Sequence, residues 1–228
     1  MKAGVLFSGG KDSAYAMFKA MQAGNEIACL ISVISENKAS YMFHTPNISL
    51  TELQAEAIGL PLLKKNTKGE KEKELVDLEE AIKEAKEKFG LEGIVTGALE
   101  SKYQATRIQK ICEGLGLECI NPLWMKDQVE LLKELIQSGF EVIVSGVFAY
   151  PLGKEWLGKK LDSEMVEALV ELREKYGISP SGEGGELETT VLDAPFFKKK
   201  LVITKTEEQM SGPNSGVLAV IEANLKEK

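Results

Sequence analysis

The segment Ser8-Gly9-Gly10-Lys11-Asp12-Ser13, which follows the apolar run Val5-Leu6-Phe7, constrains the fold of this chain most strongly. The order of residues predicts a strand, a tight glycine bend and a helix that begins at Lys11 and ends near Gly24. Glycines let the backbone approach a ligand closely, and the first turn of a helix favours an anion. The lysine charge and the serine hydroxyls add donors. The segment therefore predicts a phosphate-binding loop.

The loop differs from two common nucleotide-binding patterns. The P-loop of nucleoside triphosphatases requires Gly-x4-Gly-Lys-Ser/Thr, whereas Asp12 follows the lysine here and Val5 occupies the first glycine position. The dinucleotide fingerprint Gly-x-Gly-x-x-Gly fails because Gly9 and Gly10 are adjacent. The hexapeptide instead resembles the pyrophosphate-binding loop of N-type ATP pyrophosphatases, which split ATP between the α and β phosphates and adenylate an acceptor oxygen. A glycine turn with a helix cap and no ligand is the alternative.

Composition restricts the class of protein. The chain has 228 residues, of which 43% are hydrophobic, so a folded core is expected. No apolar run reaches the roughly 20 residues of a membrane span, and the pattern of a signal peptide is missing. The net charge of −7 disfavours extended binding to a nucleic-acid backbone. Cys29, Cys112 and Cys119 form no close pair in the sequence, which favours buried reduced thiols and a cytoplasmic location.

Strand and helix patterns alternate through the first half of the chain. Runs rich in β-branched residues predict buried parallel strands, and periodic apolar positions predict amphipathic helices. The strands are expected at 5–7, 27–34, 61–63, 93–98 and 117–120, and the helices at 11–24, 49–59, 75–89 and 106–114, the second opened by a capping box at Ser49 and Glu52. This alternation predicts an α/β fold with a doubly wound, Rossmann-like parallel sheet. Ligands bind beyond the carboxyl ends of such strands.

The pattern changes after Asn121-Pro122-Leu123-Trp124. Helices are expected at 129–138 and 164–176, strands at 141–147, 188–192, 200–205 and 217–223, and a turn at 211–216. We interpret residues 1–122 as an ATP-binding pyrophosphatase-type domain and residues 123–228 as a smaller α+β substrate-binding domain. The alternative is that strands of the second half extend the first sheet.

A second chemical motif is Gly182-Glu183-Gly184-Gly185-Glu186-Leu187-Glu188-Thr189-Thr190. Three carboxylates this close repel one another unless a cation, a basic side chain or a proton is shared. The segment is suited to bind magnesium, an amine-bearing substrate or ammonium, and its glycines allow a ligand to approach. The alternative is a solvated acidic loop.

The segment Leu99–Arg107 follows an expected strand and carries further candidates. Ser101 is expected to cap the next helix, while Tyr103, Gln104 and Arg107 are expected to face the cleft. The planar guanidinium would suit a phosphate or a carboxylate. The alternative for the arginine is an ion pair with a surface glutamate.

His44 is the only histidine and lies in the segment Tyr41–Asn47. A single histidine excludes a metal site built from several histidines, and it excludes a Ser–His triad beside a separate histidine-based glutaminase. If the protein delivers nitrogen, free ammonia is therefore the expected source.

Together these segments resemble the diphthine–ammonia ligase family. The resemblance rests on residues 8–13, 41–47, 97–107 and 121–124, and above all on Glu183–Thr189 with Val191-Leu192-Asp193-Ala194-Pro195. It implies an adenine nucleotide alpha hydrolase-like fold and amidation of diphthine, on translation elongation factor 2, by ammonia at the expense of ATP. The expected course is an acyl-adenylate that ammonia converts to the amide, with release of AMP and pyrophosphate.

We assign roles to individual residues on this basis. Nucleotide contacts are expected from Ser8, Gly9, Gly10, Lys11, Asp12, Ser13, Ser32, Ile34 and Gly97. The adenine is expected to meet the main chain near Ser32–Ile34, at the end of the second strand. Substrate contacts are expected from His44, Asn47, Tyr103, Gln104, Arg107, Glu188 and Thr189. The catalytic set is Lys11, on an exposed loop, with Asp12, Glu183 and Glu186. Asp12 orders the helix start or binds Mg²⁺, and one of the two glutamates takes a proton from ammonium.

Two other functions fit parts of the pattern. One is an ATP-dependent tRNA-modifying enzyme; its thiolating members are expected to carry a Cys-x-x-Cys pair, which Cys112 and Cys119 do not provide. The other is a regulator that binds ATP or AMP without turnover. No membrane partner is expected, and the oligomeric state stays open, a homodimer included.

Overall fold

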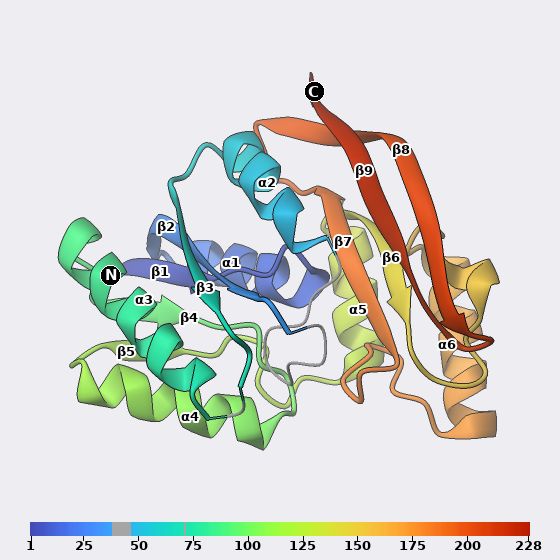
Figure 1. The fold of residues 1–228 in the computed structure, drawn as a ribbon, viewed down its shortest axis with the longest axis horizontal. Helices are drawn as coiled ribbons and strands as arrows, with labels where there is room; N and C mark the ends of the chain where they lie inside the picture. The colour runs from blue at the N-terminus through green and yellow to red at the C-terminus, as the bar shows by residue number, and fades with distance from the viewer. Residues whose placement is uncertain (38–46, 71) are drawn as a thin grey trace.

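The first half of the chain forms a parallel five-stranded sheet in a computed structural model that describes residues 1–37, 47–70 and 72–228. The strand order is β3-β2-β1-β4-β5, and the neighbouring strands run parallel (Figure 1). The strands are β1 Lys2–Leu6, β2 Glu26–Ser35, β3 Leu62–Thr67, β4 Gly93–Val95 and β5 Glu118–Ile120. The arrangement confirms the predicted α/β class.

Helices cover both faces of this sheet. The helices are α1 Lys11–Gln22, α2 Thr51–Ile58, α3 Glu74–Phe89 and α4 Lys102–Gly114. Successive residues of a strand point to opposite faces. Ile31 of β2 accordingly packs in a cluster with α3 and α4, whereas Leu30 packs in a larger cluster with α1 and α2.

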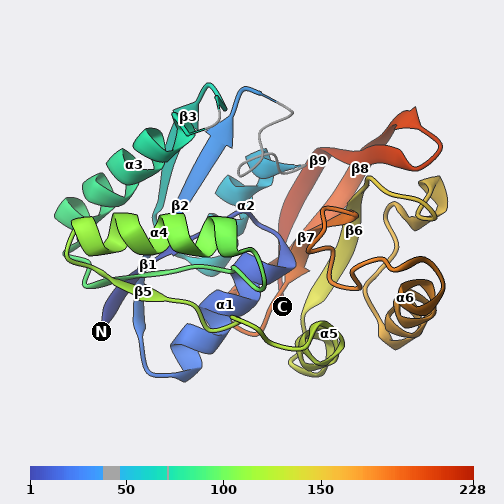
Figure 2. The same ribbon diagram turned by 90° about the horizontal axis from the view of Figure 1, so that it is seen from below.

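The second half forms a separate antiparallel sheet in the order β7-β6-β9-β8. Its strands are β6 Glu141–Val147, β7 Leu187–Asp193, β8 Lys199–Gly212 and β9 Ser215–Glu227. The helices α5 Gln128–Gln137 and α6 Ser163–Tyr176 lie side by side against it (Figure 2). Short 3₁₀ turns occur at η1 Ile48–Leu50 and η2 Lys154–Trp156. The alternative of a single extended sheet is therefore wrong.

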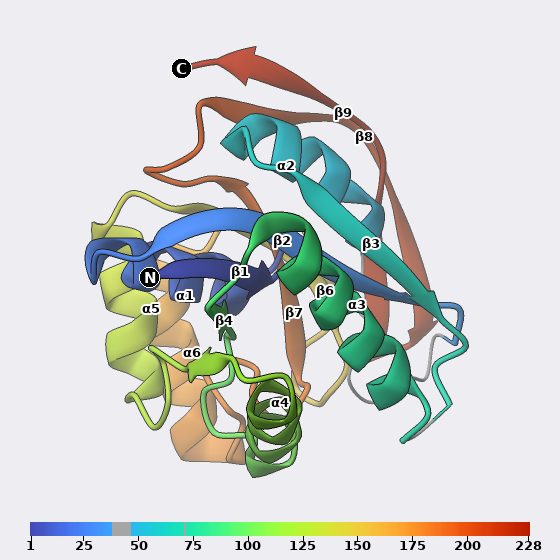
Figure 3. The same ribbon diagram turned by 90° about the vertical axis from the view of Figure 1, so that its left-hand side faces the viewer.

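One apolar cluster joins the two sheets. It runs from β1 and α1 through α5 to β6 and β7, and Figure 3 shows β6 and β7 passing behind the first sheet. Phe140, just before β6, lies edge-on to both Tyr15 and Phe18 of α1, with ring centroids 5.6 Å apart in each pair. The division at residues 122 and 123 stays a prediction, since this shared core crosses it.

Some details differ from the expected ones. The capping box at Ser49 does not form: among the described residues no side chain caps α2, which begins at Thr51. The predicted cap at Ser101 does form, because its hydroxyl accepts the N–H of Gln104 (3.3 Å), and α4 begins earlier than its apolar periodicity indicated. The fold also brings Cys112 and Cys119 into the same apolar cluster, which their sequence spacing did not indicate.

Candidate functional site

The glycine loop connects β1 to the first turn of α1. Gly9 has a φ of 81°, a left-handed conformation that favours glycine, and Gly10 is extended at the start of the helix. The hydroxyl of Ser13 closes the bend: it accepts the N–H of Ser8 (3.2 Å) and donates to the carbonyl of Gly10 (3.1 Å). The helix start thus faces the space beyond the strand, as a phosphate-binding loop requires.

Strand β7 packs directly on this loop. The N–H of Val191 donates to the carbonyl of Gly9 (3.0 Å), and the N–H of Lys11 donates to Oγ1 of Thr189 (3.1 Å). Gln54 of α2 is fully buried, and its Nε2 donates both to the Gly9 carbonyl (3.0 Å) and to the Val191 carbonyl (2.8 Å). The two motifs that carry the chemistry are therefore one hydrogen-bonded unit.

A cleft of about 550 Å³ opens where these segments meet. Apolar side chains of the first sheet and its helices line part of it, among them Phe7, Ile31, Val33, Leu78 and Ile108. The polar lining comes from the glycine loop, the segment 96–104 and the segment 181–189. A wall that combines apolar side chains with convergent polar groups is typical of a small-molecule site.

Lys11 is buried in the wall of the cleft, so the expectation of an exposed lysine is wrong. It is 2% exposed, and its Nζ donates to Oδ2 of Asp12 (2.8 Å) and to the carbonyl of Ser181 (2.5 Å). The other carboxylate oxygen of Asp12 is buried and has no hydrogen-bond partner within the described ranges. A buried carboxylate oxygen without a donor can accept a cation.

Two glutamates of the acidic segment face the cleft with raised pKa values. Burial, and then the charge of Asp12, raise the pKa of Glu183 to about 7. Burial raises the pKa of Glu188 to about 7, although Lys11 opposes the shift. Carboxyl groups that titrate near neutral pH can exchange protons with a ligand.

The cleft collects most of the predicted residues. The predicted residues that line it are Ser8, Gly10, Lys11, Asp12, Ser13, Gly97, Gln104, Glu183, Glu188 and Thr189. Gly97 is required by close packing, because a Cβ there would lie 2.8 Å from the backbone of Asp12 and Ser13. These placements leave the individual roles as proposals.

Three nucleotide candidates lie outside the described lining. The carbonyl of Gly9 is occupied by Val191 and Gln54, as above. Ser32 is buried, and its hydroxyl donates to the carbonyl of Phe7 (2.6 Å). The neighbours of Ser32 and Ile34, Ile31 and Val33, line the cleft instead. Side chains alternate along β2, but the contact expected near Ser32 and Ile34 is with the main chain, so it stays a prediction.

Tyr103 and Arg107 form a surface cluster rather than part of the cleft lining. Glu72 accepts hydrogen bonds from the Tyr103 hydroxyl (2.9 Å) and from Nη2 of Arg107 (2.6 Å). The guanidinium carbon lies 3.4 Å from the centre of the Tyr103 ring. The ion-pair alternative for Arg107 is therefore the observed one.

Asn47 and Glu186 also point elsewhere, and His44 lies outside the described residues. The side chain of Asn47 donates to the carbonyl of Leu218 (2.9 Å) and accepts the N–H of Val220 (2.8 Å). It therefore pairs with the backbone of β9. Glu186 accepts the N–H of Ser179 (2.9 Å) and borders a second depression, not the cleft. Both side chains thus organise the backbone.

Sequence reasoning missed three polar residues that organise the cleft: Gln54, Gln128 and Ser181. A glutamine on the apolar face of a helix was the available signal for Gln54. Ser181 lies in a loop whose glycines were noted, but its contact through a backbone carbonyl has no sequence signal.

In the described part of the chain, no group of three or more His, Cys, Asp or Glu side chains could hold a metal ion.

Comparisons with known proteins identify the family of the chain. The family described as "Diphthamide synthase N-terminal domain" matches residues 1–119, and "Diphthamide synthase C-terminal domain" matches residues 127–224. The chain belongs to the diphthamide synthase family. A relative named diphthine–ammonia ligase from Bos taurus is 38% identical, over 91% of this chain and 84% of the relative. Its Homo sapiens counterpart is 36% identical, over 100% of this chain and 94% of the relative.

A solved structure has a more remote likeness to this diphthamide synthase family member. It is described as a predicted subunit of tRNA methyltransferase from Methanocaldococcus jannaschii and is 19% identical in sequence. The match covers 86% of this chain and 98% of the chain in that structure, with a TM-score of 0.45. That likeness is too low to bear on function.

None of the helices within the described residues is long and apolar enough to cross a membrane.

Proposed function

We propose that the chain is a diphthine–ammonia ligase, which uses ATP and ammonia to amidate diphthine on translation elongation factor 2. The observation that carries this proposal is that the glycine loop and the acidic segment hydrogen-bond to each other and line one cleft. Membership of the family and relatives named for this reaction support it. We infer a cytoplasmic location from the same substrate.

The glycine loop is proposed to bind the outer phosphates of ATP. Ser8, Gly10, Lys11 and Ser13 all line the cleft at the start of α1. Backbone donors at a helix start and a fixed cation stabilise phosphate charge without reorganising during reaction. We place the adenine against the apolar part of the lining, near Val33.

Mg²⁺ is proposed to bind at Asp12. The buried oxygen of Asp12 that has no partner among the described residues fits a hard cation, and Mg²⁺ is usually held by one or two carboxylates together with substrate phosphates. When bound there, the ion would neutralise phosphate charge. The same oxygen suits the metal because Lys11 already occupies the other one.

The proposed chemistry has two steps. First, an oxygen of the diphthine carboxylate attacks the α-phosphorus, and the bond from that phosphorus to the pyrophosphate oxygen breaks. Ammonia then attacks the acyl carbon; a C–N bond forms, the C–O bond to AMP breaks, and the nitrogen loses one proton. The protein contributes mainly by orienting the reactants and stabilising charge.

Glu183 and Glu188 are proposed to accept that proton. Both line the cleft, and burial raises the pKa of each to about 7, so a substantial fraction is ionised at neutral pH. Glu186 is left out of this role, because its carboxylate is turned towards Ser179.

The test is to incubate the protein with ATP, Mg²⁺, ammonium and diphthine-bearing elongation factor 2. We expect AMP, pyrophosphate and the amide on the elongation factor, detected by mass spectrometry. Persistent ATP together with tight ATP binding would instead support a regulator. Turnover with tRNA, but none with the elongation factor, would support a tRNA-modifying enzyme.

A further inference from the structure

Gln128, the first residue of α5, contacts the acidic loop from outside the described lining of the cleft. Its Oε1 accepts from the N–H of Ser181 (3.1 Å), the hydroxyl of Ser181 (2.9 Å) and the hydroxyl of Ser179 (2.6 Å). The backbone N–H of Ser181 can only donate, so it fixes the amide oxygen on that side. The amide nitrogen then faces Glu100 and donates to its carboxylate (3.1 Å).

These contacts close a ring of hydrogen bonds around Glu183. The N–H of Glu100 donates to the carboxylate of Glu183 (3.2 Å), and the N–H of Glu183 donates to the hydroxyl of Ser179 (3.0 Å). Glu100 thus holds the carboxylate of Glu183, and Ser179 holds its backbone. The amide of Gln128 hydrogen-bonds to both Glu100 and Ser179.

The same amide also supports Lys11. The peptide N–H of Ser181 donates to Gln128, and the carbonyl of Ser181 accepts from Nζ of Lys11 (2.5 Å). Gln128, Ser179, Glu100 and Glu186 border a second depression of about 560 Å³. The loop 179–186 thus separates this depression from the cleft, and Gln128 holds it from the depression side.

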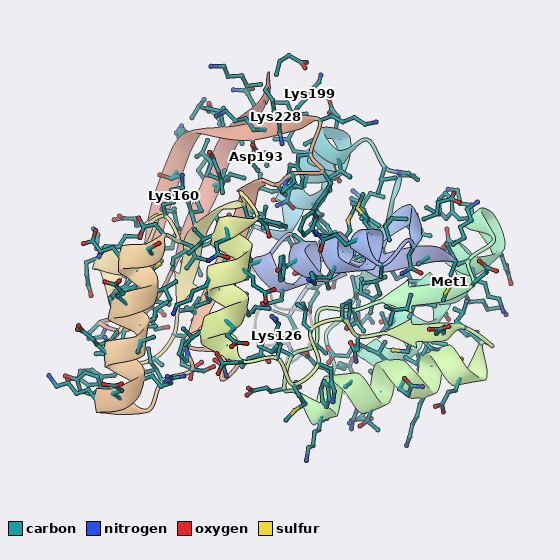
Figure 4. The ribbon with its side chains drawn as sticks, turned by 180° about the vertical axis from the view of Figure 1, so that it is seen from behind. Met1, Lys126, Lys160, Asp193, Lys199 and Lys228 are labelled. Carbon is teal, nitrogen blue, oxygen red and sulfur yellow. The ribbon has the colours of Figure 1, made fainter. Side chains whose placement is uncertain are left out.

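Helix α5 does not depend on the Gln128 side chain. The carboxylate of Asp127 caps it, accepting the N–H groups of Val129 and Glu130 (2.9 Å each). Lys126, which lies just before α5 and is labelled in Figure 4, pairs with Glu134 of α5 (2.7 Å). Leu131, Leu132 and Leu135 are buried in the shared core. Replacing Gln128 should therefore leave the helix in place.

We propose that Gln128 is a positioning residue, which fixes the carboxylate of Glu183 in the cleft through Glu100 and the two serines. This inference rests on the proposed function, in which Glu183 accepts a proton. Lys11 keeps its direct contact with Asp12 when Gln128 is lost, so the loss should affect turnover more than ATP binding.

The experiment compares Gln128→Ala, Gln128→Glu and the control Gln109→Ala in the full chain. The glutamate variant keeps an oxygen for the serines but loses the donor to Glu100. Gln109 is exposed on α4, and its side chain bonds to Glu113 of the same helix (2.9 Å). Each variant is assayed for kcat and for the KM of ATP, and hydrogen exchange is measured over residues 178–187.

We expect Gln128→Ala to lower kcat by about 10- to 100-fold, with the KM of ATP within about twofold of wild type. Exchange over 178–187 should accelerate. Gln128→Glu should lower kcat at least as far, because its carboxylate repels that of Glu100, and Gln109→Ala should match wild type.

Two results would overturn the inference while the wild-type protein is active. One is a kcat of Gln128→Ala within about twofold of wild type. The other is a parallel loss of ATP binding and melting temperature in both Gln128 variants, since that indicates a purely structural role. An inactive wild-type protein would refute the proposed function itself, which keeps the two failures distinguishable.

Discussion

At the residue scale, the charge of Lys11 faces three carboxylates in one confined space. Asp12 contacts it directly, and the same charge opposes the rise in the pKa of Glu183 and of Glu188 that burial causes. Lys11 therefore serves both the phosphates and the acidic loop. Its loss should disturb the ionisation of the glutamates as well as phosphate binding.

Lys11→Met tests this double role. We expect turnover to fall by about 100- to 1000-fold, as for loss of a preorganised charge at a reacting phosphate. The residual activity should also need a higher pH, because the pKa values of Glu183 and Glu188 rise without the lysine. A pH–rate profile from AMP release measures both effects. The control is Lys110→Met on the exposed side of α4, and an unshifted profile would contradict the coupling.

Glu183 and Glu188 also predict how stability depends on pH. Their pKa of about 7 in the folded protein exceeds the ordinary value of about 4.3 in an unfolded chain. The folded state binds more protons between these values, so the free energy of unfolding falls as pH rises through this window. We expect a loss of ~1–3 kcal/mol between pH 5 and pH 8, since both groups are partly solvated.

Urea unfolding at the two pH values measures that loss. In Glu188→Gln the loss should shrink to about half, because one of the two titrating groups is gone. If the variant keeps the full pH dependence of wild type, Glu188 does not titrate in this range.

At the element scale, the segment that follows β4 is in close contact with the start of α1 in the wall of the cleft. Gly97→Ala would place a methyl group 2.8 Å from the backbone of Asp12 and Ser13. Backbone cannot yield as a flexible side chain can, so we expect a destabilisation of ~1–3 kcal/mol. Turnover should fall by about 100-fold, since the glycine loop shifts.

Gly114→Ala is the matched control. Gly114 ends α4, and nothing in the described part of the chain lies within 4 Å of the added carbon. A helical Gly→Ala change should stabilise slightly, by up to ~1 kcal/mol. Thermal melts and AMP release separate the two variants, and equal behaviour would mean that the close contact at Gly97 does not matter.

The sequence predicted the elements better than it predicted the orientation of side chains. Apolar periodicity and the glycine loop were sufficient for the parallel sheet, and the turn expected at 211–216 lies between β8 and β9. Those two strands run longer than expected, because each pairs with the other and needs few apolar residues. Asn47 and Glu186 lie outside the cleft lining, since the side chain of each bonds to a backbone group that only the folded chain brings near.

At the scale of the whole molecule, the cleft exists only because the two halves are packed together. Gln54 joins α2, the glycine loop and β7, and the shared apolar cluster extends from β1 to β7. The far end of β7 is tied in as well: Asp193 pairs with Lys228 (2.5 Å), and both are labelled in Figure 4. Contacts this extensive favour one cooperative unit.

Cutting the chain at the predicted boundary tests that view. Residues 1–122 alone would expose the face of α1 that packs on Phe140 and α5, and residues 123–228 would expose the matching surface. We expect neither fragment to show a cooperative thermal transition, whereas the intact chain unfolds in a single one. Calorimetry and near-UV circular dichroism measure this. Two independent transitions in the intact chain, each reproduced by a fragment, would establish autonomous domains, and the cleft would then lie at an interface between separately stable parts.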